Sequence, residues 1–261
     1  MHDVKTISIQ TLETLKKHGG RVHSVFKRTL NIVSGRTLIT LAHHVGEGRH
    51  HVTLRENLDV KGKGIQPGDP VKVSHELLLI GTTTFSLQHA HVKEYRPFSK
   101  TYMLEPKHYR LLDDLKTMLI ASDKPSIYDD DAETILGRRL LQTIRTYLDN
   151  TTAIESLLGL GIGLTPLGDD FVLGYILATQ TLGETVIDDT TLDEYAHRTN
   201  QISLQALRDT LNHDYSQSFI AFLEDFYIRH SLEGAEQLLD YGASSGAAII
   251  AGFIEAINSR R

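Results

Sequence analysis

The chain reads Gly159-Leu160-Gly161-Ile162-Gly163-Leu164-Thr165-Pro166-Leu167-Gly168-Asp169-Asp170 immediately before an apolar run at 171–178, and this stretch decides the fold of the C-terminal half. Its closely spaced glycines permit positive φ angles and a close approach of backbone to backbone. Thr165 followed by Pro166 is typical of an N-cap and the first residue of a helix. The apolar run has no polar face, which indicates a helix buried in the middle of a bundle. We therefore predict that the glycines form the mouth of a central helix.

Two adjacent aspartates, Asp169 and Asp170, lie in the first turns of this predicted helix. Unpaired N–H groups at a helix N-terminus attract anions, and Gly161, Gly163 and Gly168 could bring them close to a substrate. The two carboxylates would repel a bare anion, so a phosphate or carboxylate ligand needs a Mg²⁺ held by the pair, unless one aspartate points away. Neighbouring helical residues diverge by about 100°. We expect one aspartate to face the site and the other to make a structural hydrogen bond, and the sequence leaves open which.

A structural interpretation of the same stretch is that its glycines let two helices pack closely. The spacing matches neither the phosphate-binding loop, which needs Lys and Ser or Thr after its last glycine, nor the dinucleotide fingerprint, which follows a strand. The density of special residues beside an acidic pair is more than packing alone requires. We therefore treat Thr165, Asp169 and Asp170 as candidate catalytic residues and the loop glycines as candidate substrate ligands.

A second glycine-rich segment, 241–246, precedes the last apolar stretch of the chain. Gly242 can end one helix and Ser244 or Ser245 can cap the next, which is a sufficient structural explanation. The functional alternative is that a second helix N-terminus faces the first across one cleft. In that case Ser244, Ser245 and Gly246 are further candidate substrate ligands.

The two halves of the chain differ in their hydrophobic pattern. Between residues 21 and 95, short β-like segments alternate with turn formers such as those at 67–70, which favours an antiparallel sheet or small barrel. After these segments, apolar residues recur at helical spacing. This spacing predicts helices that include 192–211, 218–229, 232–241 and 245–257. The predicted class is α+β: an antiparallel β-rich, barrel-like domain (1–104) followed by a helical domain (105–261).

The composition excludes several classes of protein. Lys and Arg number 27 against 33 Asp and Glu, and a net charge of −6 gives no global attraction for the phosphate backbone of nucleic acids. The lack of cysteine excludes disulfides, thiolate nucleophiles and zinc–thiolate sites. No signal peptide is readable, and no apolar stretch approaches the about 20 residues that span a bilayer. We expect a cytoplasmic protein that binds neither nucleic acid nor membrane.

Three further groups of polar residues are weaker candidates. His23 and Ser24 are candidate pocket residues in the β-like half, although adjacent side chains on a strand diverge. The histidine pairs 43–44 and 50–51 flank a turn, where at most one histidine of each pair could share a face. A polar surface hairpin is therefore a simpler interpretation than a metal site. The run of aspartates at 129–131 is typical of solvated loop charge.

The stretch from Gly159 to Gly174 resembles the most distinctive motif of the AllH-like proteins. That motif reads Gly-x-Gly-x-Gly-Leu-Thr-Pro-Ser-Gly-Asp-Asp-Phe before apolar residues and a glycine. The chain matches it except at Leu167, where the family has serine.

Three other segments extend the resemblance over most of the chain. Residues 20–26 resemble the family's N-terminal strand, and 199–207, including Ser203, resemble its middle helix. Residues 242–252 resemble its C-terminal segment, with Ala243 in place of an expected histidine. These three segments carry less weight than the glycine motif.

The AllH-like family is associated with bacterial oxamate carbamoyltransferase in allantoin breakdown, a part of purine catabolism. The resemblance implies one subunit of a transferase complex, in which oxalurate and phosphate give oxamate and carbamoyl phosphate. Loop N–H groups and Thr165 would hold the oxyanion and the phosphate, while Asp169 or Asp170 would orient the leaving nitrogen or hold Mg²⁺. Leu167 and Ala243 each remove a polar group from the family pattern, so the substrate and the catalytic competence stay open.

Two other functions also stay open. The first is a non-catalytic binding or scaffold subunit, whose glycine loops shape an interface with its partners. The second is a metal-dependent hydrolase that uses the histidines.

Overall fold

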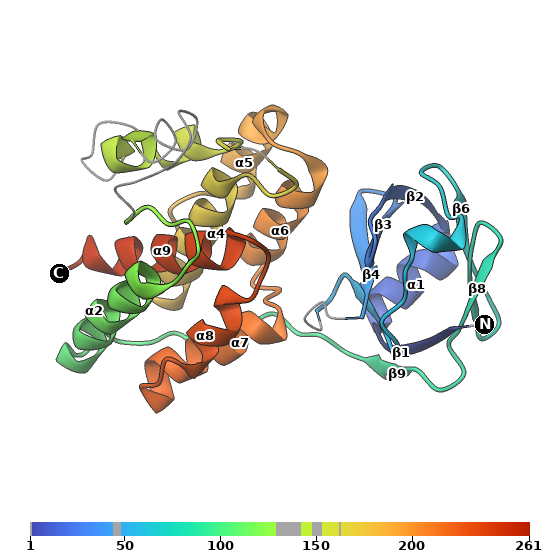
Figure 1. Ribbon diagram of the computed structural model, residues 1–261, viewed down its shortest axis with the longest axis horizontal. Helices are drawn as coiled ribbons and strands as arrows, with labels where there is room; N and C mark the ends of the chain where they lie inside the picture. The colour runs from blue at the N-terminus through green and yellow to red at the C-terminus, as the bar shows by residue number, and fades with distance from the viewer. Residues whose placement is uncertain (1, 44–47, 129–141, 148–152, 162) are drawn as a thin grey trace. The chain divides into compact units, whose positions relative to one another are not determined.

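The computed structural model describes residues 2–43, 48–128, 142–147, 153–161 and 163–261. Figure 1 shows the two compact units of the chain, the β-rich unit Met1–Pro97 and the helical unit Phe98–Arg261. The predicted α+β class, with a barrel-like unit followed by a helical one, is confirmed.

The β-rich unit is a closed barrel. Its strands are β1 (His2–Ser8), β2 (Gly20–Val25), β3 (Thr29–Ser34), β4 (Thr37–Ala42), β5 (His51–Leu54), β6 (Pro70–Ser74), β7 (Leu77–Ile80), β8 (Thr83–Ser86) and β9 (His91–Lys93). Neighbours follow the order β5-β4-β3-β2-β6-β7-β8-β1, pairing of β5 with β1 closes the ring, and β9 adds to β1. Most pairs are antiparallel, as expected, but β1–β8, β1–β9 and β4–β5 are parallel. Closure pairs the strand edges that an open sheet would expose.

The period of two along each strand explains the barrel interior. In β3, for example, Leu30 and Ile32 are fully buried in the barrel core. Helix α1 (Ile9–His18) is capped by the Ser8 side chain and adds Leu15 to the same core. A short 3₁₀ turn, η1 (Lys61–Lys63), precedes β6.

The helical unit is built on one buried pair of helices, α4 and α9. Its elements are α2 (Pro106–Ala121), η2 (Ile154–Leu157), α4 (Leu167–Thr181), α5 (Asp189–Tyr195), η3 (Ala196–Arg198), α6 (Gln201–Leu211), α7 (Gln217–Glu224), η4 (Asp225–Arg229), α8 (Glu233–Leu239) and α9 (Ser245–Asn258). Every residue from Gly168 to Thr181 is buried. The apolar run after the glycine stretch is thus a buried helix, the kind of element that its lack of a polar face indicates.

Two glycines let α4 and α9 touch backbone to backbone. A Cβ at Gly174 would lie 1.9 Å from the Ile249 carbonyl oxygen, and a Cβ at Gly252 would lie 2.0 Å from the Phe171 carbonyl oxygen. No side chain fits at these distances, so the close crossing of the two helices depends on glycine at both positions.

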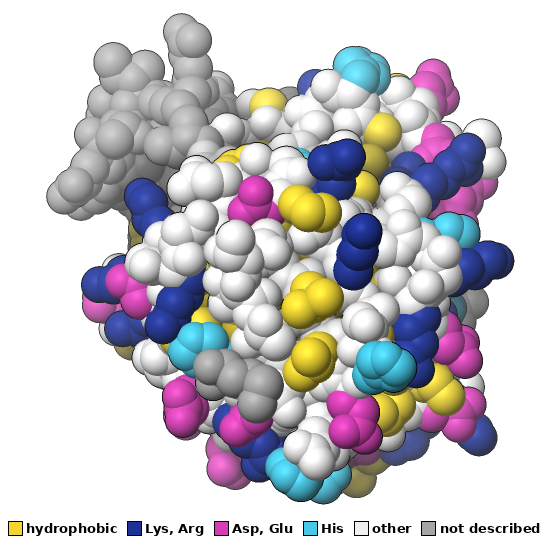
Figure 2. All heavy atoms as spheres, turned by 90° about the vertical axis from the view of Figure 1, so that its right-hand side faces the viewer, with side chains coloured by type: hydrophobic (Ala, Val, Ile, Leu, Met, Phe, Trp, Pro, Cys, Tyr) yellow, Lys and Arg dark blue, Asp and Glu magenta, His cyan; other side chains and the backbone are white. Residues whose placement is uncertain are grey.

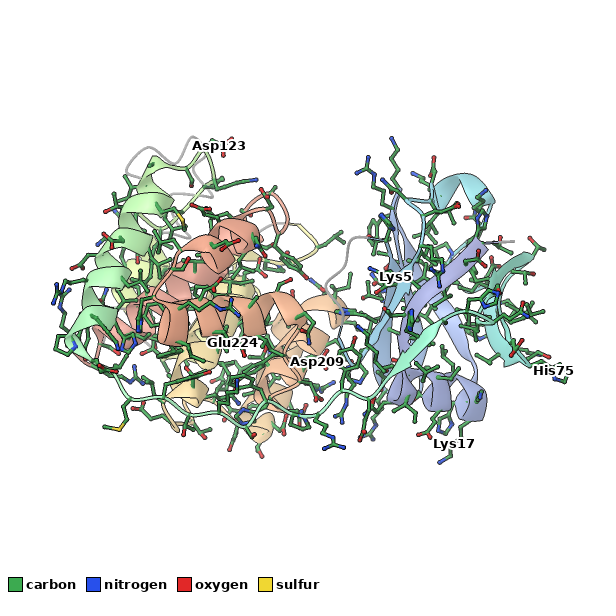
Figure 3. All side chains as sticks on the ribbon, turned by 90° about the horizontal axis from the view of Figure 1, so that it is seen from below. Lys5, Lys17, His75, Asp123, Asp209 and Glu224 are labelled. Atoms are coloured by element: carbon green, nitrogen blue, oxygen red, sulfur yellow. The ribbon has the colours of Figure 1, made fainter. Side chains whose placement is uncertain are left out.

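The segment before α2 lies on the helical unit. The Phe98 N–H donates to the His213 carbonyl at 2.8 Å. Lys100 forms an ion pair with Glu224, the last residue of α7, at 3.0 Å, and Figure 3 labels this glutamate. Residues 98–104 follow the barrel in sequence and begin the helical unit with these contacts.

The single helix expected at 192–211 is wrong, because the chain breaks it in two. Helix α5 ends in the turn η3, and Thr199 is extended before Asn200 begins α6 as its N-cap. The Asn200 side chain accepts hydrogen bonds from the N–H groups of Ile202 and Ser203. Asparagine is a favoured N-cap, but the apolar period runs across the break and conceals it.

The barrel face in Figure 2 carries Lys, Arg, Asp and Glu side chains interspersed with one another. Because the two signs alternate, neighbouring charges on this face partly cancel and do not sum to one strong field. Among the described residues, no helix has both the length and the apolar character that crossing a membrane requires.

Candidate functional site

The glycine stretch leads into α4, but the helix starts one residue later than expected. Pro166 has φ −52° and ψ 138°, so it is the N-cap, and Leu167 is the first helical residue. The Pro166 carbonyl accepts from the N–H groups of Asp169 at 2.9 Å and Asp170 at 3.2 Å. The expected N-cap role of Thr165 is therefore wrong, because the extended ψ of Pro166 moves the cap. Ile162 lies outside the described residues.

Two glycines of the stretch are required by backbone packing. A Cβ at Gly159 would lie 1.8 Å from the Arg198 carbonyl oxygen, and a Cβ at Gly168 would lie 2.1 Å from the Leu157 carbonyl oxygen. The Gly168 N–H also donates to the Leu160 carbonyl at 2.8 Å. These contacts give Gly168 a packing role and occupy its N–H group, so its N–H does not serve the function proposed below.

Gly161 also packs against backbone, at the first residues of α4, whereas Gly163 borders open space. Their φ angles are +120° and +107°, a region that favours glycine. A Cβ at Gly161 would lie 2.8 Å from the nitrogen of Leu167, the first N–H of the helix, whereas a Cβ at Gly163 would face open space. A side chain at Gly161 would therefore collide with the start of α4, the end of a helix at which anions bind.

Asp169 is the structural member of the aspartate pair. Its carboxylate accepts a hydrogen bond from the Gly159 N–H at 2.7 Å and another from the Thr199 hydroxyl. Burial raises the pKa of Asp169, while these bonds and the nearby Ser203 hydroxyl lower it. The Ser203 hydroxyl approaches Asp169 without a well-aligned hydrogen bond. Asp169 thus ties the glycine stretch to the start of α6.

Asp170 has a different environment. It is 5% exposed, and its Oδ2 has no hydrogen-bond partner among the described residues. Burial is the main cause that raises the pKa of Asp170 to about 7; the charge of Asp169 adds to this effect, and the Ser245 and Thr165 hydroxyls oppose it. A carboxylic acid with such a pKa can give or take a proton near neutral pH. Of the two aspartates, Asp169 therefore makes the structural hydrogen bonds, and Asp170 keeps an oxygen without a partner among the described residues.

A hydrogen bond joins the starts of the two central helices. The hydroxyls of Thr165 and Ser245 lie 2.9 Å apart. Asp170 is close to both hydroxyls, since each lowers its pKa. The N-cap residues, Pro166 for α4 and Ser244 for α9, make no side-chain cap bond. The N-termini of two buried helices therefore meet beside one buried carboxyl group.

The start of α6 lies at the same place. Asn200, its N-cap, donates through its side-chain amide to the Leu164 carbonyl at 2.9 Å. Thr199, the preceding residue, holds Asp169. The break before α6 therefore places two polar side chains, Thr199 and Asn200, in hydrogen bonds with Asp169 and with the glycine stretch.

Tyr241, at the head of the second glycine-rich segment, is near Asp170 although it was not among the candidate site residues. Burial and the charge of Asp170 both raise the pKa of Tyr241, so its hydroxyl lies within electrostatic reach of Asp170, although 46% of the residue is exposed. Its carbonyl accepts from the Gly246 N–H at 2.9 Å, and a Cβ at Gly246 would lie 1.9 Å from the Leu238 carbonyl oxygen. Gly246 therefore has a packing role. The place of Tyr241 at the head of the second glycine-rich segment is the signal that could have found it.

His23 and Ser24 belong to the barrel unit, on β2. A β-bulge between Val22 and Ser24 brings the two side chains together, with His23 Nδ1 3.1 Å from Ser24 Oγ. The expectation that they diverge is wrong, because the bulge interrupts the alternation of the strand. Asn31 donates to Ser24 Oγ at 3.0 Å. The three residues form a polar group on the barrel.

The arrangement of the aspartate pair favours the alternative without Mg²⁺, in which the two carboxylates have separate environments. Both carboxylate oxygens of Asp169 already accept hydrogen bonds, which leaves Asp170 Oδ2 as the oxygen without a partner. Within the described parts of the chain, no three His, Asp or Glu side chains form a group that could hold a metal ion. His44 and the aspartates at 129–131 lie outside these parts.

Comparison with protein families finds two matches. Residues 157–257 match the family described as oxamate carbamoyltransferase subunit AllH, and residues 4–93 match the AllH family N-terminal domain. Comparison with curated proteins and with solved structures finds no match. The two family matches cover most of the chain and include both glycine-rich segments. The chain therefore belongs to the AllH family, whose name is that of a subunit of oxamate carbamoyltransferase.

Proposed function

We propose that the chain is a subunit of a carbamoyltransferase that acts on a small carboxylate, with its site where α4 and α9 begin. The observation that carries this proposal is the buried Asp170 Oδ2, which has no partner among the described residues. An unsatisfied buried polar group costs about 1–3 kcal/mol, so a fold that keeps one needs a reason outside its own packing. A ligand at the mouth of α4 supplies that reason.

The family name suggests the reaction. Oxalurate and phosphate give oxamate and carbamoyl phosphate: a phosphate oxygen bonds to the ureido carbonyl carbon, and the bond from that carbon to the oxamate nitrogen breaks. The leaving nitrogen takes up one proton, and the attacking hydrogen phosphate gives one up. Asp170 suits the transfer of this proton, because its pKa of about 7 lets it act as an acid and be reprotonated at neutral pH.

The other parts of the site bind and orient the substrates. The N–H of Leu167, at the start of α4, and the hydroxyls of Thr165 and Ser245 are donors for the phosphate and the developing oxyanion. Asp169 positions the glycine stretch through its own hydrogen bonds and does not touch the reacting atoms.

Leu167 and Ala243, the two departures from the family pattern, affect the choice of substrate more than the structure of the glycine stretch. Leu167 packs its side chain against the helical core and still presents its backbone N–H at the start of α4. Ala243 is exposed and removes one polar side chain from the turn before α9. We infer that the chain keeps the anion-binding part of the site and differs in the contacts that select the rest of the substrate.

The test is phosphate-dependent oxalurate breakdown by the chain together with its partner subunits, followed as carbamoyl phosphate. We expect Asp170→Asn to lower kcat by about a hundredfold or more, as is typical for loss of a general acid. Asp240→Asn removes an exposed carboxylate next to Tyr241 and should leave kcat unchanged. Full activity in Asp170→Asn would contradict the proton-transfer role of Asp170.

A second candidate function, a binding or scaffold subunit, rests on two exposed apolar residues at the mouth. Leu164 is 52% exposed and Tyr241 is 46% exposed. A partner subunit could cover both residues. Assembly with partners that Leu164→Asp disrupts, with activity that Asp170→Asn leaves intact, supports this function over the catalytic one.

A further inference from the structure

The starts of α4 and α9 lack something that other helices of this protein have. Helices α1, α5, α6 and α7 each receive a side-chain cap, from Ser8, Asp188, Asn200 and Ser216. The N-cap residues of the central helices α4 and α9, like that of the short helix α8, provide none. Backbone carbonyls accept from the N–H groups of Gly168 and Gly246, so the N–H groups that a ligand could satisfy are those of the first helical residues, Leu167 and Ser245.

Two buried polar atoms without partners lie at the same place. Asp170 Oδ2 and Ser203 Oγ have no hydrogen-bond partner among the described residues, and the two side chains are 5% and 2% exposed. Asp170 stands beside Thr165 and Ser245, which join the two helix starts, and Ser203 stands beside Asp169. A buried carboxyl oxygen without a partner thus lies at the starts of α4 and α9, and a buried hydroxyl without one lies nearby on α6.

We propose that the first turns of α4 and α9 form a metal-free oxyanion subsite for phosphate or a small carboxylate, in which the neutral Asp170 carboxyl donates a hydrogen bond to the anion. This inference deepens the proposed function and rests on the same site. It needs no Mg²⁺ between the aspartates, because the Asp169 carboxylate is held by Gly159 and Thr199 and Asp170 is neutral.

The charged and polar groups around Asp170 determine whether its carboxyl group is ionised or neutral when an anion is bound. The groups that face it are Asp169 on α4, the Thr165 and Ser245 hydroxyls, and Tyr241 before α9. Among the described residues, no Lys, Arg or His contributes to the pKa of Asp170. An ionised Asp170 would therefore add to the repulsion that a bound anion meets, whereas a neutral Asp170 removes that repulsion and adds a donor.

The helix starts supply the attraction that a metal would otherwise provide. Each helix N-terminus acts as roughly half a positive charge. With Asp170 neutral and Asp169 bound to Gly159 and Thr199, two such ends face the anion. Solvent provides the proton that neutralises Asp170, and in the proposed reaction this proton then passes to the leaving nitrogen.

The experiment measures sulfate binding to the full chain by calorimetry at pH 6, in EDTA and without added metal. Sulfate keeps its charge at this pH, and competition by inorganic phosphate or by oxamate then distinguishes a phosphate subsite from a carboxylate subsite. We expect saturable binding in EDTA that Mg²⁺ changes by less than about twofold. Asp170→Asn presents an amide donor and should bind within about threefold of the wild type, since one neutral hydrogen bond replaces another.

Two variants complete the test. Asp170→Ala removes the donor and should weaken binding by about tenfold or more, and the control Asp240→Asn, which removes an exposed carboxylate outside the subsite, should bind like the wild type. A requirement for Mg²⁺, the loss of binding in Asp170→Asn, or no anion binding at all would each overturn the inference. Binding without carbamoyl transfer by the assembled enzyme would instead leave this subsite standing and reject the proposed reaction.

Discussion

The middle of the α4–α9 pair and its N-terminal end belong to the same two helices, but the middle is close backbone packing and the end holds buried polar groups. In the middle, the absence of side chains at Gly174 and Gly252 lets the two backbones touch. At the N-terminal end, Thr165, Ser245 and Asp170 place hydroxyls and a carboxyl group in a buried position. The first region serves stability alone. The second keeps an unsatisfied oxygen at a cost in stability, which is characteristic of a functional site.

The largest effect is expected in the middle of the pair. Gly252→Ala would put a methyl group 2.0 Å from the Phe171 carbonyl oxygen, and only a shift of one helix relative to the other can relieve this overlap. We expect the free energy of unfolding to fall by about 4–5 kcal/mol, measured by urea denaturation.

The control for this prediction is Ala251→Gly, in the same buried turn of α9. It should cost only about 1 kcal/mol, through helix propensity. Equal losses in the two variants would show that the backbone contact does not hold the helices together.

The next largest effect is expected at the N-terminal end, where Asp170→Asn should increase the free energy of unfolding above pH 4. Burial raises the pKa of Asp170 from 3.8 to about 7, so the folded state binds a proton that the unfolded state has released between these two values. The free energy of unfolding therefore falls as pH rises from about 4 to about 7, and the penalty is complete above that range. Asp170→Asn cannot ionise and escapes the penalty.

We expect Asp170→Asn to be more stable than the wild type by about 2–3 kcal/mol at pH 8, with a small difference at pH 4. About three pKa units correspond to about 4 kcal/mol, and burial of the amide takes back part of this gain. Thermal unfolding of both proteins across this pH range measures the difference. A variant that is less stable than the wild type at pH 8 would show that the charged carboxylate is favourable in the folded state.

The sequence could predict the middle of the pair better than its end. The apolar run 171–178 has no polar face, and burial on all sides is the environment that such a helix requires. The barrel, too, follows from short alternating segments and turns, although its parallel pairs depend on contacts between distant strands, which local patterns do not encode.

The end of the pair depends on tertiary contacts that a linear pattern does not contain. The one-residue shift of the cap arises from the ψ of Pro166, and the different environments of the two aspartates arise from Thr199 and Gly159, which lie far apart in sequence. The motif could therefore name the candidate residues without assigning their separate environments. Tyr241 was missed for the same reason, since only the fold brings it near Asp170.

The smallest effect is expected from removing the threonine hydroxyl beside each aspartate, which should change the pKa of that aspartate alone. The Thr165 hydroxyl bonds to Ser245 and lowers the pKa of Asp170, whereas the Thr199 hydroxyl bonds to Asp169. Thr165→Val keeps the shape and removes the hydroxyl, so it should cost about 1 kcal/mol of stability. It should also raise the pKa of Asp170, because one of the two hydroxyls that oppose the effect of burial is gone.

Thr199→Val is the matched control for that change. It should cost a similar or somewhat larger free energy, because its bond goes to a carboxylate. It should also raise the pKa of Asp169, from which it removes a bond that lowers the pKa. Carboxyl ¹³C shifts followed by NMR during a pH titration report each aspartate separately. If Thr165→Val and Thr199→Val moved the pKa of Asp170 equally, the two aspartates would share one environment, and the division between a structural Asp169 and a ligand-facing Asp170 would be wrong.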